Sequence, residues 1–147
     1  MPIMPQPIVA LVEDLVFTAK LRAAAQAAGA SLQTTTQVEE FLPLVRAAAP
    51  GLILVDLNFS RADALQVVAR VRELANGRST PIIGFLSHVQ TERAQQAISA
   101  GCTAALPRSL FVQQLPLLLR DGIAALGDPA APAADLIAGP ADSSDAP

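Results

Sequence analysis

The sequence predicts an α/β fold, a doubly wound parallel sheet of five strands with helices on both of its faces. Short aliphatic runs alternate five times along the chain with stretches in which apolar residues recur at helical spacing. The central runs are apolar at consecutive positions, which is typical of strands that are buried on both faces of a sheet. Of the 147 residues, 52% are hydrophobic, so a single domain has enough apolar side chains for its own core.

Five strands and five helices are expected from these patterns. The strands are IVALV (8–12), the more polar SLQTTT (31–36), LILVDL (52–57), PIIGFL (81–86) and TAAL (103–106). The apolar faces of the first four helices fall within 17–28, 41–49, 65–74 and 91–101, and Gly29 ends the first helix. Ser109 is the expected cap of a last helix, which ends near Leu126.

Four further residues are expected to shape the helices. Thr36 and Glu39 have the spacing of a capping box for the second helix. Asp63 is a suitable N-cap for the third helix. Pro43 predicts that the second helix starts late or bends, because proline cannot donate a hydrogen bond inside a helix. Pro116 predicts a kink in the last helix for the same reason.

Charge and composition exclude several classes of protein. The net charge is -3 and the ten lysine and arginine residues are scattered singly, so we expect no binding to nucleic acid. No apolar run reaches the roughly 20 residues that cross a bilayer, so we expect no membrane span. Cys102 is the only cysteine, which excludes an internal disulfide and fits a reducing compartment. We therefore expect a cytoplasmic protein.

The composition changes after residue 126. Residues 127–147 are rich in proline, alanine and acidic residues and show no sustained period, so we expect a disordered acidic tail. Within this tail, DLIAG (135–139) is a candidate docking motif. The tail is too short to fold by itself, so residues 7–126 form the one expected domain, with no separate output domain after it.

Polar side chains gather at the carboxyl ends of four expected strands, where open α/β sheets bind their ligands. They are Glu13 and Asp14 after the first strand, Asp56 and Asn58 at the third, Ser87 after the fourth and Arg108 after the fifth. Three carboxylates at one edge would repel one another and raise the proton affinity of Asp56, unless a divalent cation lay among them. Glu13 and Asp14 have a second interpretation, in which they only cap the first helix.

This arrangement resembles the receiver domain of two-component response regulators. The stretches that carry the resemblance are ALVEDL, LILVDLN, PIIGFLS and GCTAALPRSLF. The resemblance implies a flavodoxin-like fold with the strand order 2-1-3-4-5, in which Asp56 is the phosphoacceptor. The implied ligands of Mg²⁺ are Glu13, Asp14, Asp56 and Asn58, and the phosphate-contacting candidates are Ser87 and Arg108.

The resemblance also implies partners. A histidine kinase or another phosphorelay protein would supply the phosphoryl group, and the fourth helix, fifth strand and fifth helix would form a homodimer surface. We expect Glu92 and Arg93 to be exposed on that surface. We expect no enzymatic activity, because Ser87 and His88 lack the nucleophile elbow of a hydrolase, and Asn58 stands where a dehalogenase-type phosphatase needs an aspartate.

Six positions depart from the family pattern, two of them being Ser60 and Ala64, which stand where the family tends to have proline and glycine in the loop after the acceptor. Leu86 stands where receivers usually have a threonine or serine that donates to the phosphoryl group, and Ser87 comes one residue later, on the opposite side of the strand. Ala105 replaces the aromatic residue that rotates when receivers switch. Arg108 replaces a lysine. Ser109 replaces the following proline, so we expect no cis peptide bond there.

Two functions remain open for this atypical member. The first is a single-domain response regulator that is phosphorylated on Asp56 and signals through protein contacts, which the acidic residues favour. The second is a pseudo-receiver, a protein-interaction module that works without phosphorylation. Leu86, Ala105 and Arg108 favour this second function.

Overall fold

The computed structural model describes residues 7–74, 79–87, 91–121 and 137–138. The elements alternate between strand and helix along the chain, as predicted. They are β1 (Ile8–Leu11), α1 (Leu15–Ala28), β2 (Leu32–Thr35), α2 (Val38–Ala48), β3 (Leu52–Asp56), α3 (Ala64–Glu73), β4 (Ile82–Leu86), α4 (Thr91–Ala100), β5 (Ala104–Pro107), α5 (Arg108–Asp121) and β6 (Ile137–Ala138). Among the described residues, no helix is long and apolar enough to cross a bilayer.

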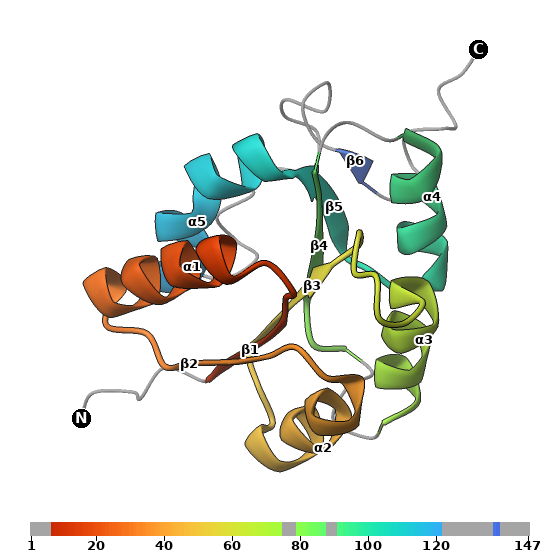
Figure 1. Ribbon diagram of the computed structural model, residues 1–147, viewed down its shortest axis with the longest axis horizontal. Helices are drawn as coiled ribbons and strands as arrows, with labels where there is room; N and C mark the ends of the chain where they lie inside the picture. The colour runs from red at the N-terminus through yellow and green to blue at the C-terminus, as the bar shows by residue number, and fades with distance from the viewer. Residues whose placement is uncertain (1–6, 75–78, 88–90, 122–136, 139–147) are drawn as a thin grey trace.

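The strands form one sheet in the order β2-β1-β3-β4-β5-β6 (Figure 1). Strands β1 to β5 are parallel, which confirms the predicted fold class and the order 2-1-3-4-5. The added strand β6 pairs antiparallel with β5, with Ala138 opposite Ala104 and Ile137 opposite Ala105. We predicted no regular structure in the tail, and these two residues of DLIAG are an exception. The rest of the tail lies outside the described residues.

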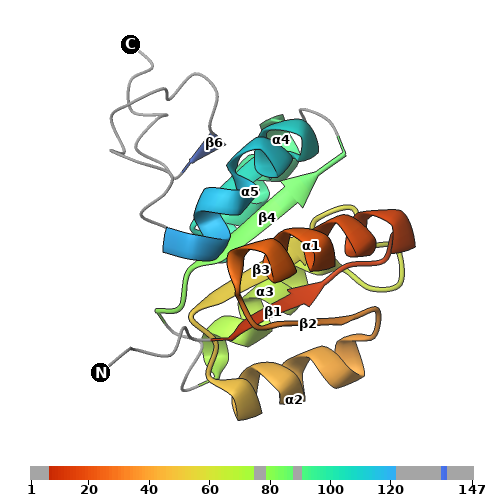
Figure 2. The same cartoon turned by 90° about the vertical axis from the view of Figure 1, so that its left-hand side faces the viewer.

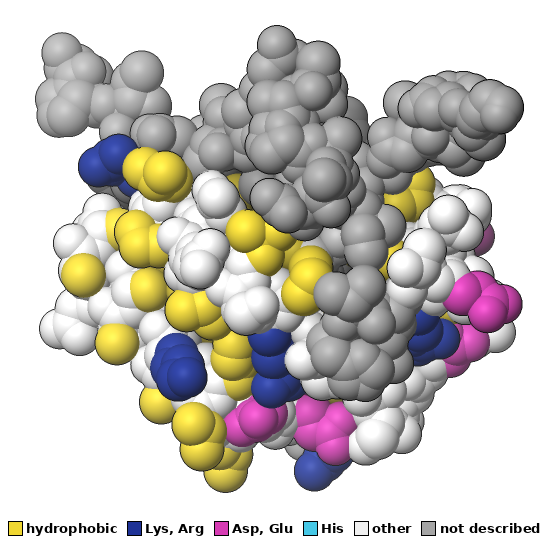
Figure 3. Space-filling view, turned by 90° about the horizontal axis from the view of Figure 1, so that it is seen from above, with side chains coloured by type: hydrophobic (Ala, Val, Ile, Leu, Met, Phe, Trp, Pro, Cys, Tyr) yellow, Lys and Arg dark blue, Asp and Glu magenta, His cyan; other side chains and the backbone are white. Residues whose placement is uncertain are grey.

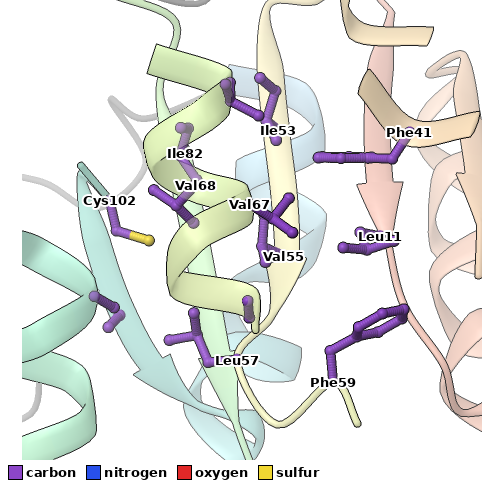
Figure 4. Packing of buried hydrophobic residues seen from close by; sticks show 14 of the residues in the cluster. Leu11, Phe41, Ile53, Val55, Leu57, Phe59, Val67, Val68, Ile82 and Cys102 are labelled. Carbon is purple, nitrogen blue, oxygen red and sulfur yellow. The ribbon is translucent and has the colours of Figure 1, made fainter. Parts of the chain in front are cut away.

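Helices cover both faces of the sheet. Figures 1 and 2 show α1 and α5 on one face and α2, α3 and α4 on the other. Side chains alternate between these faces along each strand: in β3, Leu52 and Leu54 pack toward α1 and α5, while Ile53 and Val55 pack toward α2 and α3 (Figure 4). The buried runs of aliphatic residues therefore serve two cores, one on each side of the sheet.

Local chemistry sets the helix boundaries. Asp63 caps α3 by accepting a hydrogen bond from Leu65 N at 3.0 Å, as predicted. Gly29 ends α1 in the left-handed conformation, with φ 69°. The predicted capping box of Thr36 and Glu39 is wrong, because α2 begins one residue later, after Gln37.

The hydroxyl of Thr35, and not that of Thr36 as predicted, makes the hydrogen bonds at the start of α2. It accepts a hydrogen bond from Gln37 N at 3.1 Å and donates one to Glu40 Oε1 at 2.8 Å. Thr35 is buried at the end of β2, so its hydroxyl gains from both partners. The turn into α2 is therefore held by the last residue of the strand.

The prolines do not delay the helices. Helix α2 starts at Val38, before Pro43, so the predicted late start is wrong. Pro43 and Glu39 are both exposed, so water can bond the Glu39 carbonyl that the proline leaves without a helical partner. Helix α5 includes Pro116 and begins at Arg108, directly after β5, so Ser109 is not its cap. The predicted end near residue 126 lies outside the described residues.

Leu57, the residue that follows Asp56, packs closely against β4. A Cβ atom on Gly84 of β4 would lie 2.6 Å from Cδ1 of Leu57, so a side chain at position 84 would force Leu57 to shift. Leu57 is fully buried, and its amide donates to the Phe85 carbonyl at 2.9 Å. The chain that leaves Asp56 is therefore pressed onto the neighbouring strand.

Gly84→Ala tests this packing. We expect the variant to lose about 1–3 kcal/mol of unfolding free energy, because the buried Leu57 side chain must shift within a packed core. Adding Leu57→Ala makes room for the new methyl group and should cost less on the Gly84→Ala background than on the parent. Urea denaturation of the four proteins measures both effects. Additive losses in the double variant would contradict the contact.

Candidate functional site

The predicted site residues meet at the carboxyl edge of the sheet. Asp56 ends β3, Asp14 follows β1 and Arg108 follows β5, so three parallel strands of one sheet bring them to the same edge. Figure 3 shows acidic and basic side chains next to each other along the lower border of the molecule. The topology therefore confirms that charged residues far apart in the sequence share one edge.

Asp56 is a buried carboxylate, with only 3% of its surface exposed. Its Oδ1 accepts a hydrogen bond from Asn58 N at 2.9 Å, and its Oδ2 lies 3.6 Å from Nη2 of Arg108. Burial raises the pKa of Asp56, while the Asn58 amide and the Arg108 charge oppose that rise. The direction is the one we expected, but its main cause is desolvation, and the negative charge of Glu13 contributes least.

Of the two roles that the sequence left open for Asp14, the structure shows the helix cap. It is the N-cap of α1, and its Oδ1 accepts from Val16 N at 2.8 Å and Phe17 N at 3.2 Å. Its Oδ2 lies 3.3 Å from Nη1 of Arg108. The Phe17 amide, first among several causes, lowers the pKa of Asp14. The helix cap thus holds the carboxylate ionised and turns its second oxygen toward the site.

Glu13 does not cap the helix. Its Oε1 accepts from Ser60 N at 2.7 Å, and its Oε2 accepts from the Ser60 hydroxyl at 2.6 Å. These hydrogen bonds, the hydroxyl first, lower the pKa of Glu13. The expected mutual repulsion therefore does not govern Glu13 or Asp14. Glu13 joins the end of β1 to the loop that follows Asp56.

Arg108 lies between the two aspartates and rests on aromatic rings. Its guanidinium carbon is 4.5 Å from the ring centroid of Phe17 and 5.7 Å from that of Phe85. Phe85 stacks on Phe111 at 5.0 Å. A planar guanidinium can stack on rings and still reach two carboxylates, whereas the ammonium group of lysine is a single point of charge. The described residues contain no cis peptide bond, which agrees with Ser109 in place of proline.

The end of β4 carries the clearest departure from the receiver pattern. Leu86 is fully buried in the core beneath α3 and α4, where its side chain offers no hydrogen bond. The register of β4 with β5 is continuous through Leu86, so no bulge turns Ser87 inward. Instead, the backbone amide of Ser87 donates to Oδ1 of Asn58 at 2.6 Å. This bond connects the loops that follow β3 and β4.

Arg93 is a residue that sequence reasoning placed wrongly. It is partly buried, and its Nε and Nη2 donate to the Leu57 carbonyl at 3.1 and 3.0 Å. Glu92 is exposed, as predicted. The Leu57 contact spans 36 positions, and no local pattern indicates it. Helix α4 is thus bonded directly to the residue after Asp56.

The carboxylates at the carboxyl edge of the sheet fit a divalent cation in part. Oδ2 of Asp14 and Oδ2 of Asp56 face the same guanidinium, so two carboxylate oxygens already converge on one positive charge. Glu13 is turned away toward Ser60. Within the described ranges, no three acidic, histidine or cysteine residues form a group that would hold a metal ion. Asp14 and Asp56 therefore fit a divalent cation, and Glu13 would first have to leave Ser60.

Comparison with known proteins assigns the chain to a family. A family model described as the response regulator receiver domain matches residues 9–120. The chain belongs to this family. Receiver domains are signalling modules that interact with histidine kinases or phosphotransfer proteins, and they generally bind Mg²⁺ at the phosphorylation site.

Individual relatives of this receiver domain are distant. The "Uncharacterized 14.6 kDa protein in sodA1 3'region" of Leptolyngbya boryana is 29% identical over 73 residues, or 50% of this chain. The match covers 56% of that protein, so the chain spans about half the length of the curated relative.

Solved structures agree in fold over most of the receiver domain. The chemotaxis response regulator CheY4 of Vibrio cholerae has a TM-score of 0.72 at 21% identity, over 82% of this chain and 100% of CheY4. The Mn²⁺-bound form of response regulator Rcp1 has a TM-score of 0.66 at 12% identity, over 78% of this chain and 91% of Rcp1. Both support the flavodoxin-like fold.

Asp56→Asn tests the electrostatics of the site. The pKa of Asp56 is higher in the folded protein than its ordinary value of 3.8. The free energy of unfolding of the parent therefore falls as the pH rises from 3.8 through the raised pKa. The variant carries no such charge, so its free energy of unfolding should exceed that of the parent at neutral pH. This gain should vanish in acid, where the parent is protonated as well. Urea denaturation across this pH range measures it.

Glu13→Gln is the matched control with the opposite sign. The pKa of Glu13 is lower in the folded protein than its ordinary value of 4.5, so ionised Glu13 stabilises the fold at a pH above 4.5. This stabilisation disappears as the pH falls through the lowered pKa. At neutral pH the variant should be less stable than the parent. A stability change of the same sign in both variants would contradict the description of the two carboxylates.

Proposed function

We propose that this receiver domain accepts a phosphoryl group on Asp56 from a histidine kinase or another phosphorelay protein, and signals through protein contacts. One observation carries the proposal: Asp56 is a buried carboxylate whose Oδ1 is held by a backbone amide, while its Oδ2 faces a cation. A side chain kept for packing alone would not retain a costly buried charge at a sheet edge. We keep the expectation that the protein works in the cytoplasm.

In the proposed reaction, Oδ2 of Asp56 attacks the phosphorus atom of the donor. A P–O bond forms to Asp56, and the bond from phosphorus to the donor nitrogen or oxygen breaks with its electron pair on the leaving group. Arg108 lies within reach of the transferred group and can bind its oxygens in a bidentate manner. The Asn58 amide keeps the attacking carboxylate in one orientation. Ser87, which no bulge turns inward, would contact the phosphoryl group only if the end of β4 shifted.

We propose that Mg²⁺ binds to Asp14, Asp56 and the carbonyl of Asn58, with Glu13 joining if it releases Ser60. When bound, the ion would neutralise charge on the phosphoryl oxygens. The protein contributes Asp14, which its helix cap keeps ionised and oriented. Arg108 neutralises the same carboxylates, so arginine and metal ion compete for them.

The alternative is a pseudo-receiver that binds partners without phosphorylation. Leu86 favours it, because its buried apolar side chain provides no hydrogen bond to a transferred phosphoryl group. Ala105 favours it as well, since β5 carries no ring there that could rotate. The rate of phosphorylation separates the two functions.

Phosphorylation is tested with acetyl phosphate and Mg²⁺. We expect the parent to gain one phosphoryl group slowly, Asp56→Asn to gain none, and Leu86→Thr to react about a hundredfold faster than the parent, because a hydroxyl donor to the developing charge is restored. Intact-mass spectrometry over time measures the added group.

Leu86→Val is the matched control for this experiment. Valine has the shape of threonine without its hydroxyl, so it loses the same leucine packing and should not accelerate the reaction. If the valine variant reacts as fast as the threonine variant, the hydroxyl argument is wrong. If neither the parent nor Leu86→Thr gains a phosphoryl group, the pseudo-receiver is the correct function.

Metal binding is tested separately by titration with Mg²⁺, followed by amide NMR. Arg108→Ala should bind Mg²⁺ on the order of tenfold more tightly than the parent, because the competing charge is gone. Asp14→Asn keeps the helix cap but removes one ligand charge, so it should bind more weakly. Glu13→Gln should change the affinity little. Unchanged affinity in both Arg108→Ala and Asp14→Asn would place the ion elsewhere.

A further inference from the structure

The composition of β5 suits it to pairing with another strand. The residues of β5 before Pro107 are Ala104, Ala105 and Leu106, which are apolar and buried and include no charge that would repel another strand. The opposite edge, β2, is made of the more polar sequence LQTT, in which only Thr35 is buried. An apolar edge strand with free backbone groups pairs readily with another strand.

The structure covers this edge with the chain's own β6. Strand β6 pairs antiparallel with β5, and it also lies against α4 (Figure 1). This is the surface of α4, β5 and α5 that the sequence predicted for a homodimer. The chain therefore places its own segment where a partner was expected.

The register identifies which amide of β5 faces β6. Thr103 N donates to the Ile82 carbonyl at 2.7 Å, so the amide of Thr103 faces β4. Successive amides of a strand point to opposite sides, so the amide of Ala104 faces away from β4 and toward β6, and the amide of Ala105 faces β4 again. Ala138 is opposite Ala104, which makes this pair the point of attachment.

We propose that β6 is a built-in ligand of the β5 edge, which withholds this edge and the adjoining part of α4 from other proteins until it is released. Fifteen residues separate Asp121 from Ile137, and a chain of this length spans up to about 50 Å. The attachment is intramolecular, because a tethered segment has an effective concentration far above that of a second copy. Two paired residues make a short strand, which a partner can displace.

Amide hydrogen exchange of the full-length chain tests the attachment. Ala138→Pro removes the backbone donor opposite Ala104, and Ala138→Ser keeps it. In Ala138→Pro, the Ala104 amide should exchange about tenfold faster than in the parent, while the Ala105 amide, which faces β4, keeps its rate. Ala138→Ser should match the parent at both positions. An Ala104 amide that exchanges equally fast in the parent and in Ala138→Pro would overturn the proposal.

Protein concentration distinguishes the tether from a second copy. If β6 binds its own chain, protection of the Ala104 amide is the same in dilute and concentrated samples of the parent, and light scattering gives a monomer mass. Protection that increases with concentration, together with a dimer mass, would show exchange of β6 between two chains and would contradict an intramolecular ligand.

A synthetic peptide of residues 133–141 (AADLIAGPA) tests the competition. The peptide should shift the amide signals of β5 in Ala138→Pro, whose edge is free, and should bind the parent at least about tenfold more weakly. Equal binding to the parent and to Ala138→Pro would show that β6 does not withhold the edge. Because none of these measurements involves Asp56, their failure is distinct from failure of the phosphorylation proposal.

Discussion

The site depends on one guanidinium shared by two carboxylates. Arg108 starts α5 directly after β5, and its planar group faces Asp14 from β1 and Asp56 from β3. Burial of Asp56 is costly for its charge, and the arginine provides part of the compensation. Phe17 and Phe85 support the guanidinium from below. Removing the aromatic support or the arginine would therefore alter the ionisation of the proposed phosphoacceptor.

The loop after Asp56 is held from two sides. Leu57 packs on Gly84 and accepts two hydrogen bonds from Arg93 of α4. Asn58 bonds to Asp56 through its amide and to Ser87 through its side chain. In this receiver, where Leu86 and Ala105 replace the usual switch residues, these contacts connect the site directly to β4 and α4.

The sequence predicted the features that local patterns encode. Aliphatic runs such as LILV located the buried strands, and the order of charged residues at strand ends indicated the family. The capping box failed because Thr35 and Thr36 are equally suited by type, and only the end of β2 decides which hydroxyl meets α2. The contact of Arg93 with Leu57 could not be predicted from local patterns, because it joins residues 36 positions apart.

Helix α4 contacts both the loop that follows Asp56 and strand β6. On one side, Arg93 attaches the helix to the residue after Asp56. On the other side, α4 and β5 carry β6. A change at Asp56 that displaces the Leu57 carbonyl must strain or break the Arg93 bonds, and a shift of α4 must alter the surface on which β6 lies. Because Ala105 provides no ring to transmit such a change, α4 itself is the shortest physical connection between the proposed phosphorylation of Asp56 and the proposed release of the β5 edge.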